Sequence, residues 1–190
     1  MNGQVYDIDG DIVIRSARLD DARMIARYFS DNRKHLKPWE PKREEEFFVE
    51  AGWAQRLIKL RELQSMALGY YLLILDMSAN EMVGTISFSQ ISRFPLHSCY
   101  VGYSLAEKAQ GKGIMTRALK MACRYMFEAQ NMHRISATYM PRNVRSEDVL
   151  NRLGFQYEGK MKDYLLINEQ WEDHHMTSLI NPDWQARTAS

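Results

Sequence analysis

Two glycines near the centre of the chain, Gly111 and Gly113, stand between a strand-like and a helix-like segment. Residues 114–129, which follow them, are rich in Ala, Met, Leu, Lys and Arg, all good helix formers. A helix that begins directly after glycines points unpaired N–H groups and the positive end of its dipole at whatever lies before it. Glycines lack a Cβ, so an anion can approach their backbone closely. The spacing predicts a binding site for a phosphate or pyrophosphate group.

Common phosphate motifs do not fit these glycines well. A P-loop needs four residues between its glycines and then Gly-Lys-Ser/Thr, whereas one residue separates Gly111 from Gly113 and no such triplet follows. A dinucleotide-binding turn reads G-x-G-x-x-G, and Thr116 occupies its third glycine position. A plain glycine turn that opens a helix stays as the other interpretation.

A second segment, residues 143–159, gives the glycine loop a context. Together the two segments resemble the acetyl-CoA site of the GNAT acyltransferase superfamily, with the loop pattern Q/R-x-x-G-x-G/A and then an Asn-led helix ending in Gly-Phe. The matching residues are Gln110, Gly113, Asn143 and the pair Gly154-Phe155. Met115 stands where the superfamily usually has Gly or Ala. A contact with the cofactor through the backbone N–H of Met115 would tolerate this difference.

Further motifs, spread over nearly the whole chain, occur together in one group of that superfamily. They are Asn32-Arg33, Leu36-Lys37-Pro38-Trp39-Glu40-Pro41, Gly102-Tyr103-Ser104, Tyr139-Met140-Pro141, Lys162-Asp163-Tyr164-Leu165-Leu166-Ile167, Gln170-Trp171, Asp173-His174 and Pro182-Asp183-Trp184. This set resembles the RimJ-type ribosomal-protein-alanine N-acetyltransferases. The resemblance implies acetyl transfer from acetyl-CoA, without a metal, to the N-terminal alanine of small-subunit ribosomal protein number five.

The resemblance also implies which residues bind acetyl-CoA. In the superfamily the strand before the glycine loop splays open, and its backbone binds the acetyl and pantetheine groups. The cofactor-binding residues expected here are Gly102, Tyr103, Ser104, Leu105, Gln110, Gly111, Lys112, Gly113, Ile114, Met115 and Asn143. For residues 102–105 the alternative interpretation is an ordinary sheet strand. For Asn143 it is an ordinary helix N-cap.

Ser146 is the candidate proton donor for the departing thiolate. On a helix it shares a face with Val149, Leu150 and Leu153, so its hydroxyl points inward. Many superfamily members use a Tyr as this acid, but Leu150 stands at that position here. A Ser at the position of Ser146 is the proposed acid in the related RimL-type enzymes. A core Ser bonded to its own helix is the alternative.

No strong general base is apparent in the sequence. Some relatives carry a Glu on the strand at the position of Tyr100. Near pH 7.5 roughly a third of N-terminal amines are already neutral, against about one lysine in a thousand. The absence of a strong base therefore fits an N-terminal acceptor better than a lysine. If a carboxylate acts through water, Glu40 is the first candidate, because Trp39 and two prolines could fix it, followed by Asp163 and Glu158. A solvated loop glutamate is the alternative.

Several other side chains have two interpretations. The aromatic residues expected to line a groove for a peptide end, unless they are core, are Trp39, Tyr103, Tyr139 and Tyr164. Arg142, Arg145 and Arg152 could meet the cofactor's phosphates or ribosomal RNA, or form a solvated helix face. The pair His174-His175 lacks further ligands at metal spacing, so we interpret it as structural.

Composition limits the class of protein. A chain of 190 residues with 45% hydrophobic residues predicts one domain over residues 1–190. A net charge of +1 argues against a DNA-binding or other nucleic-acid-coating protein, although a local basic patch that contacts ribosomal RNA or an assembling ribosomal particle stays possible. Cys99 and Cys123 lie in apolar surroundings and predict buried free thiols. No signal peptide or membrane-spanning run is recognisable, so a cytoplasmic protein without membrane contact is expected.

The hydrophobic patterns predict a mixed α/β (α+β) fold of the GNAT type, with a mostly antiparallel sheet, splayed at the acetyl-CoA site, and helices on both faces. The expected strands are residues 11–19, 70–75, 82–90, 99–105, 134–139, 155–163 and 170–179. The expected helices are residues 20–32, 44–64, 114–129 and 143–153. The helix over 44–64 is expected to bury Phe47, Ala51, Ala54 and Ile58.

Two rival functions remain open at this point. An acetyltransferase for a small amine, such as a polyamine or an antibiotic, predicts a small acidic pocket instead of an open aromatic groove. A ribosome-assembly or regulatory factor with incidental or lost transferase activity would fit the missing Tyr acid and strand Glu.

Overall fold

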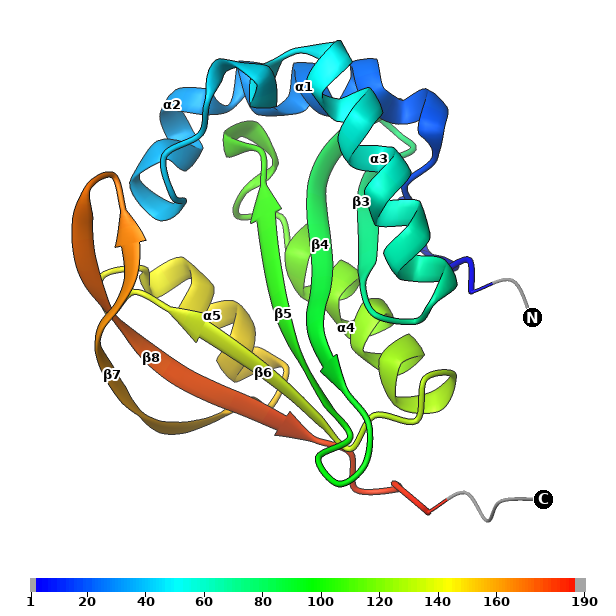
Figure 1. Ribbon diagram of the computed structural model, residues 1–190, viewed down its shortest axis with the longest axis vertical. Coiled ribbons are helices and arrows are strands. Elements are labelled where there is room, and N and C mark those ends of the chain that lie inside the picture. Colours follow the sequence, from blue (N-terminus) through cyan, green and yellow to red (C-terminus); the bar gives the residue numbers. More distant parts are fainter. Residues whose placement is uncertain (1–2, 187–190) are drawn as a thin grey trace.

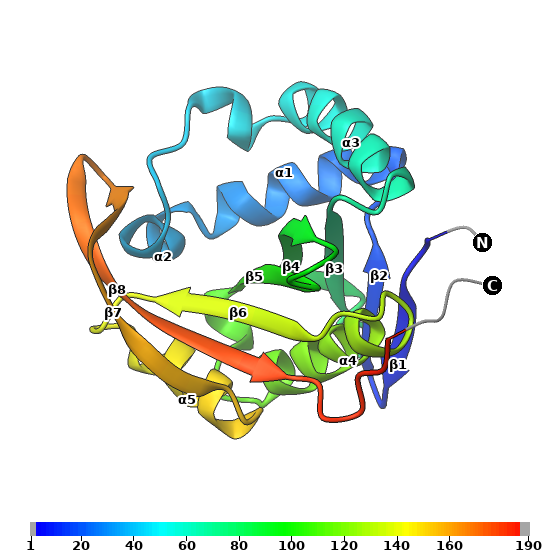
Figure 2. The ribbon, with the colours of Figure 1, turned by 60° about the horizontal axis from the view of Figure 1, so that its bottom comes forward.

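The computed structural model describes residues 3–186. It contains one eight-stranded sheet with helices on both faces (Figures 1 and 2). The strands are β1 (Tyr6–Asp9), β2 (Ile12–Ser16), β3 (Tyr70–Asp76), β4 (Glu81–Ser92), β5 (Ser98–Leu105), β6 (Arg134–Tyr139), β7 (Gln156–Ile167) and β8 (Gln170–Ile180). The α-helices are α1 (Ala22–Asp31), α2 (Arg33–Leu36), α3 (Glu50–Ser65), α4 (Ile114–Glu128) and α5 (Val144–Arg152). Short 3-10 turns are η1 (Leu19–Asp21), η2 (Lys37–Trp39), η3 (Glu45–Phe48) and η4 (Glu107–Ala109).

The strands follow the order β1-β2-β3-β4-β5-β6-β8-β7. Only the β5–β6 pair is parallel; the other pairs in the described sheet are antiparallel. Helices α1, α2 and α3 lie on one side of the sheet, and α4 and α5 lie on the other (Figure 2). The expected fold class, a mixed and mostly antiparallel α/β sheet covered on both faces, is confirmed.

Strands β5 and β6 pair only at their beginnings. Ser98–Tyr100 of β5 faces Arg134–Ser136 of β6, and beyond that point β5 pairs with β4 alone. The two strands then diverge, as Figure 1 shows. The backbone groups on the β6 side of residues 101–105 are consequently free of the sheet, as the expected splay requires.

The core lies between the sheet and both helical layers. Leu72, Leu73 and Ile74 on β3 are fully buried because this central strand is covered from both sides. Helix α4 buries residues around much of its circumference, including Ala118, Leu119, Ala122 and Met126. Cys99 and Cys123 are free and buried, as expected, and burial raises the pKa of the Cys99 thiol to about 12.

The predicted helix over residues 44–64 is wrong in its phase. It is divided into η3 and α3 by Val49, whose backbone is extended. Because α3 begins again after this break, the expected inward residues Ala51, Ala54 and Ile58 are exposed. Trp53 and Leu57 are buried instead, with 2% exposure each. Strand β1 was not predicted; its exposed, four-residue pattern carries little apolar alternation.

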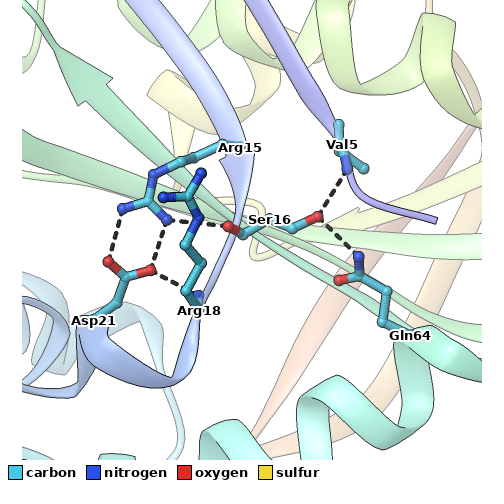
Figure 3. Close-up of polar contacts among 6 residues, drawn as sticks. All are labelled: Val5, Arg15, Ser16, Arg18, Asp21 and Gln64. Atoms are coloured by element: carbon cyan, nitrogen blue, oxygen red, sulfur yellow. Dashed lines mark hydrogen bonds and ion pairs between the residues drawn. The ribbon is translucent and has the colours of Figure 1, made fainter. Parts of the chain in front are cut away.

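A partly buried polar cluster fixes the chain at the end of β2 (Figure 3). Arg15 forms a bidentate ion pair with Asp21, with distances of 2.6 and 2.7 Å, and the Arg18 N–H also donates to Asp21. The Ser16 hydroxyl accepts from the Val5 N–H and from the Gln64 amide, both at 2.9 Å. Arg15 therefore anchors η1, and the neighbouring Ser16 anchors the segment before β1 and the end of α3.

Candidate functional site

A large cleft of about 1050 Å³ opens where β5 and β6 diverge. Its walls come from both sides of the sheet: residues of α1, η2 and α3 line one part, and residues of α4 and α5 line the other. A cleft with two such arms can receive two substrates from opposite sides and bring their reactive groups together at β5. Direct transfer between two bound molecules requires this kind of geometry.

The glycine loop forms the bottom of one arm. Gly111 and Gly113 have φ angles of +73° and +72°, a left-handed conformation that L side chains rarely adopt, and a Cβ at either position would meet no atom within 4 Å. Gly113 is the N-cap of α4, and no described side chain caps this helix. Its first N–H groups therefore have no side-chain partner among the described residues, which fits the phosphate cradle expected there.

Gln110 is held from two sides beside this loop. Its amide nitrogen lies 3.1 Å from Nε2 of His35, and its amide oxygen accepts a hydrogen bond from Arg145. Residues 110, 111 and 113–115 and Asn143 line the cleft, whereas Lys112 does not. The structure thus brings together every cofactor residue expected at the loop except Lys112.

On β5, Gly102 to Leu105 all line the cleft. The Ser104 hydroxyl lies 2.9 Å from both the Tyr28 hydroxyl and the Thr85 hydroxyl. Burial raises the pKa of Tyr28, so it is a neutral phenol at physiological pH. Tyr28, Thr85 and His35 are site neighbours that sequence reasoning missed, because no local pattern distinguishes them from core or surface residues.

Ser146 lies in the cleft at the beginning of α5. The Asn143 side chain accepts a hydrogen bond from the Ser146 N–H at 3.2 Å, which makes Asn143 the N-cap of this helix. The Ser146 hydroxyl lies 2.8 Å from the Tyr103 hydroxyl, and Tyr103 also donates to the Ser146 carbonyl at 3.2 Å. Burial raises the pKa of Tyr103. The two side chains form a neutral hydroxyl pair across the splay.

Glu40 lines the other arm, directly after η2. Its side chain is 22% exposed, and burial raises its pKa, although Arg43 at 3.7 Å opposes this shift. A carboxyl group with a raised pKa in a cleft is a candidate for proton transfer. The two further base candidates do not line the cleft, and Glu158 is bound to Arg134 and to the Ser178 hydroxyl.

Three of the four expected groove aromatics, Trp39, Tyr103 and Tyr139, line the cleft. The Tyr139 hydroxyl donates to Glu147 at 3.0 Å; burial and this carboxylate raise the pKa of Tyr139 to about 12. Tyr164 does not line the cleft; its ring packs against His174 at 5.5 Å.

Of the three arginines considered above, Arg142 lies beside η2, in the same arm of the cleft as Glu40. Its guanidinium forms an ion pair with Glu172 at 2.9 Å and lies 5.0 Å from the Trp39 ring centre. Arg145 contacts Gln110, as described above, and both Arg145 and Arg152 line the cleft.

Within residues 3–186 no group of three or more His, Cys, Asp or Glu side chains is arranged to hold a metal ion. His174 is buried, with its Nδ1 3.0 Å from the Glu172 carbonyl oxygen. Over the same residues, no helix combines the length and the apolar character that crossing a bilayer would require.

The geometry agrees with the comparison to known families. A model of the acetyltransferase (GNAT) domain matches residues 11–156. The chain belongs to the GNAT acetyltransferase family. It is therefore an N-acetyltransferase, and the family and reaction class that its motifs indicated are confirmed.

Similar proteins cover nearly the whole chain. The sequence is 46% identical to the [ribosomal protein uS5]-alanine N-acetyltransferase of Escherichia coli over 91% of this chain and 89% of that protein. The solved ribosomal-protein-S5-alanine acetyltransferase of Vibrio fischeri is 49% identical and superposes with a TM-score of 0.93 over 96% of this chain and all of that chain. Mycobacterium smegmatis RimJ in complex with CoA-disulfide is 30% identical, with a TM-score of 0.84 over 89% of this chain and 81% of that one. The RimJ-type resemblance is thus confirmed.

Proposed function

We propose that this enzyme transfers the acetyl group of acetyl-CoA to the α-amine of the N-terminal alanine of ribosomal protein uS5. Two of the relatives described above carry that activity in their names, and their similarity extends over about nine-tenths of this chain or more. The observation that carries the proposal within the structure is the arm of the cleft around Trp39, whose lining includes the basic side chains Arg43 and Arg142.

The chain's own residues supply a fitting acetyl-CoA site. The free N–H groups after Gly113 would bind the pyrophosphate, and Gln110 and Arg145 flank them. The unpaired edge of residues 101–105 would bind the pantetheine amides and the acetyl carbonyl. Acetyl-CoA supplies an activated thioester; the protein orients it and stabilises the charge that develops on its carbonyl oxygen.

Proton transfer then falls to groups on opposite sides of β5. Glu40, with its raised pKa, would take a proton from the acceptor amine, through water where needed. Ser146 would donate a proton to the departing thiolate sulfur, with its hydroxyl positioned by Tyr103 at 2.8 Å. Since an α-amine has a pKa of about 7.7–8.0, Glu40 needs only to complete a deprotonation that is already partial.

The composition of the cleft argues against a polyamine or a cationic antibiotic as the acceptor. Among the described residues that line it, Glu40 and Asp148 are the only carboxylates. The lysine and arginine side chains of the lining are Arg43, Arg56, Lys59, Arg142, Arg145 and Arg152. A small polycation would be repelled from such a surface, whereas one end of a polypeptide would not.

The proposal also gives the enzyme a place and a partner. Ribosomal proteins are made and assembled in the cytoplasm, so we assign the enzyme to that compartment. Any contact with ribosomal RNA or an assembling particle would then serve to present the N-terminus of the acceptor.

The test is the intact mass of the small-subunit ribosomal proteins from cells with and without this gene. The expected result is the loss of one acetyl increment from uS5 in the deleted strain, restored by the wild-type gene and not by a Gly113→Asp variant. An unchanged mass for every ribosomal protein would reject the acceptor. If the variant rescues growth or assembly without acetylation, the binding-factor alternative is correct.

A further inference from the structure

Helix α3 provides one wall of the acceptor arm, the part of the cleft that is lined by residues of α1, η2 and α3. It lies on the same side of the sheet as α1 and α2 (Figure 2). Besides the buried Trp53, four of its residues line the cleft: Arg56, Lys59, Leu60 and Leu63. Their spacing of three, four and seven residues puts them on one face of the helix. Two cations and two leucines therefore stand together along this wall.

The two cations have no anionic partner in the structure. Among residues 3–186, neither Arg56 nor Lys59 forms an ion pair, and both side chains are exposed. By contrast, Glu50 at the beginning of the same helix is bound to Arg23 at 2.9 Å. The cleft wall thus offers unneutralised positive charge to whatever enters.

A continuous row of contacts links this wall to the reaction centre. The Glu40 carboxylate lies 3.7 Å from Arg43, and the Arg43 guanidinium carbon lies 4.4 Å from the centre of the Phe47 ring. The Arg56 guanidinium carbon lies 5.1 Å from the same ring. Lys59 follows one helical turn further on. A chain that enters beside α3 passes these cations before its end reaches Glu40.

We propose that Arg56 and Lys59 bind an acidic side chain of the acceptor polypeptide, a few residues after its reacting amine. This inference rests on the proposed function and adds to it the chemistry by which the acceptor is selected. An extended chain advances about 3.3–3.6 Å per residue, so the third to fifth acceptor residues lie opposite this row when the first lies at Glu40 and Ser104.

The shape of the wall favours a polypeptide over a nucleic acid. Leu60 and Leu63 lie beside the cations and can pack against aliphatic parts of a peptide. The row ends at the carboxylate of Glu40, which attracts an amine and repels a phosphate. A peptide whose N-terminal amine is followed by an acidic side chain matches both ends of the row: the amine pairs with Glu40, and the carboxylate pairs with Arg56 and Lys59.

The test is a set of short peptides that begin with Ala and are otherwise uncharged. A single Glu, Gln or Lys is placed in turn at positions two to six, and kcat/KM is measured with saturating acetyl-CoA. We expect Glu at one of positions three to five to raise kcat/KM about two- to fivefold over Gln, the range for exposed ion pairs, and Lys to lower it.

Variants then assign the preference to residues. The double variant Arg56→Glu/Lys59→Glu is expected to invert the Glu-to-Lys ratio, and Arg56→Gln/Lys59→Gln to abolish it. Arg61→Glu is the matched control, since this exposed α3 residue does not line the cleft and should leave the ratio unchanged. Ratios between peptides on one variant are insensitive to partial loss of folded enzyme.

Equal kcat/KM for Glu, Gln and Lys at every position would overturn the inference and leave the proposed function intact. So would a Glu preference that survives both double variants. A double variant that instead loses affinity only for a ribosomal RNA oligonucleotide would identify a phosphate site and also overturn it. If the wild type acetylates none of these peptides while uS5 is acetylated in cells, the first residues alone do not select the acceptor, and the inference is overturned with the proposed function intact. An unacetylated uS5 in cells would reject the proposed function itself, and the inference with it.

Discussion

The hydroxyl groups of Tyr103 and Ser146 lie 2.8 Å apart, on elements that are far apart in the sequence. Tyr103 belongs to β5 at the point where that strand has left β6, and Ser146 lies on the first turn of α5. Because a hydroxyl both donates and accepts, each group can orient the other and pass on a proton. Under the proposed mechanism, Tyr103 of β5 would assist Ser146, where many members of the superfamily carry a Tyr acid on this helix.

Ser146→Ala is expected to lower kcat by about 100-fold, the lower end of the range for a lost general acid, with little change in the KM for acetyl-CoA. Tyr103→Phe should lower kcat in the same direction because it removes the group that orients Ser146. If the pair acts as a unit, the double variant will be close to the worse single variant. The measurement is steady-state acetylation of an Ala-initiated peptide.

Ser146→Thr, which keeps a hydroxyl at this position, serves as the control and should retain most of the rate. Full activity in Ser146→Ala would exclude the hydroxyl as proton donor.

Glu40→Gln should make the enzyme slower but more stable. Burial raises the pKa of Glu40, so the folded protein holds this proton more tightly than the unfolded chain does, and the folded state loses stability as pH rises above the ordinary carboxyl pKa. The amide removes that loss at neutral pH. With an α-amine acceptor we expect about a tenfold fall in kcat/KM.

Urea unfolding of both proteins at acidic and neutral pH, together with acetylation rates, checks this prediction. Glu44→Gln on the same loop is the control, because its side chain is exposed. A Glu40→Gln variant that is less stable than wild type at neutral pH would contradict the assignment.

Gly113→Ala is expected to weaken acetyl-CoA binding by about tenfold. The substitution forces an L residue into the left-handed region, at a cost of about 1 kcal/mol, and places a methyl group in the anion cradle. Gly113→Asp adds a negative charge there and should weaken binding further, by at least about 100-fold.

Gly10→Ala imposes a similar strain, at φ +59°, in the turn between β1 and β2. Calorimetry should show comparable stability losses for the two alanine variants but an unchanged dissociation constant for acetyl-CoA in Gly10→Ala. Equal dissociation constants for acetyl-CoA in Gly113→Ala and Gly10→Ala would show that the phosphate does not bind at Gly113.

Asp21→Ala should destabilise the fold by about 1.5–3 kcal/mol, because it leaves the partly buried Arg15 guanidinium without its partner. Burial acts to raise the pKa of Asp21, but the hydrogen bonds from Arg15 and the Arg18 N–H outweigh it and the pKa is lowered. The stabilisation is therefore complete above the ordinary carboxyl pKa and is lost as pH falls through the lowered value. Urea unfolding across this pH range measures it. Asp20→Ala, at an exposed neighbour, should change the free energy of unfolding little.

Local sequence patterns predicted most of the elements well. The strands that form the centre of the sheet and the helix after the glycine loop were expected within a few residues of their bounds, because apolar alternation and helix propensity act locally. The same reasoning fails at Val49, because this extended residue interrupts the helical pattern and changes the phase of α3. Trp53 is then buried against Phe29, and its indole N–H donates to the Phe47 carbonyl at 2.7 Å.

The sequence alone predicted the glycine loop before α4, the inward position of Ser146 and the family, since each depends on residue types at fixed local spacing. Tertiary structure decided which distant groups meet: Tyr103 with Ser146, Tyr28 and Thr85 with Ser104, and Arg56 with the ring of Phe47. It also left Lys112 and Tyr164 outside the cleft. The physical reason is that long-range neighbours follow from strand order and helix phase, and these are set by packing of the whole chain and not by any one segment.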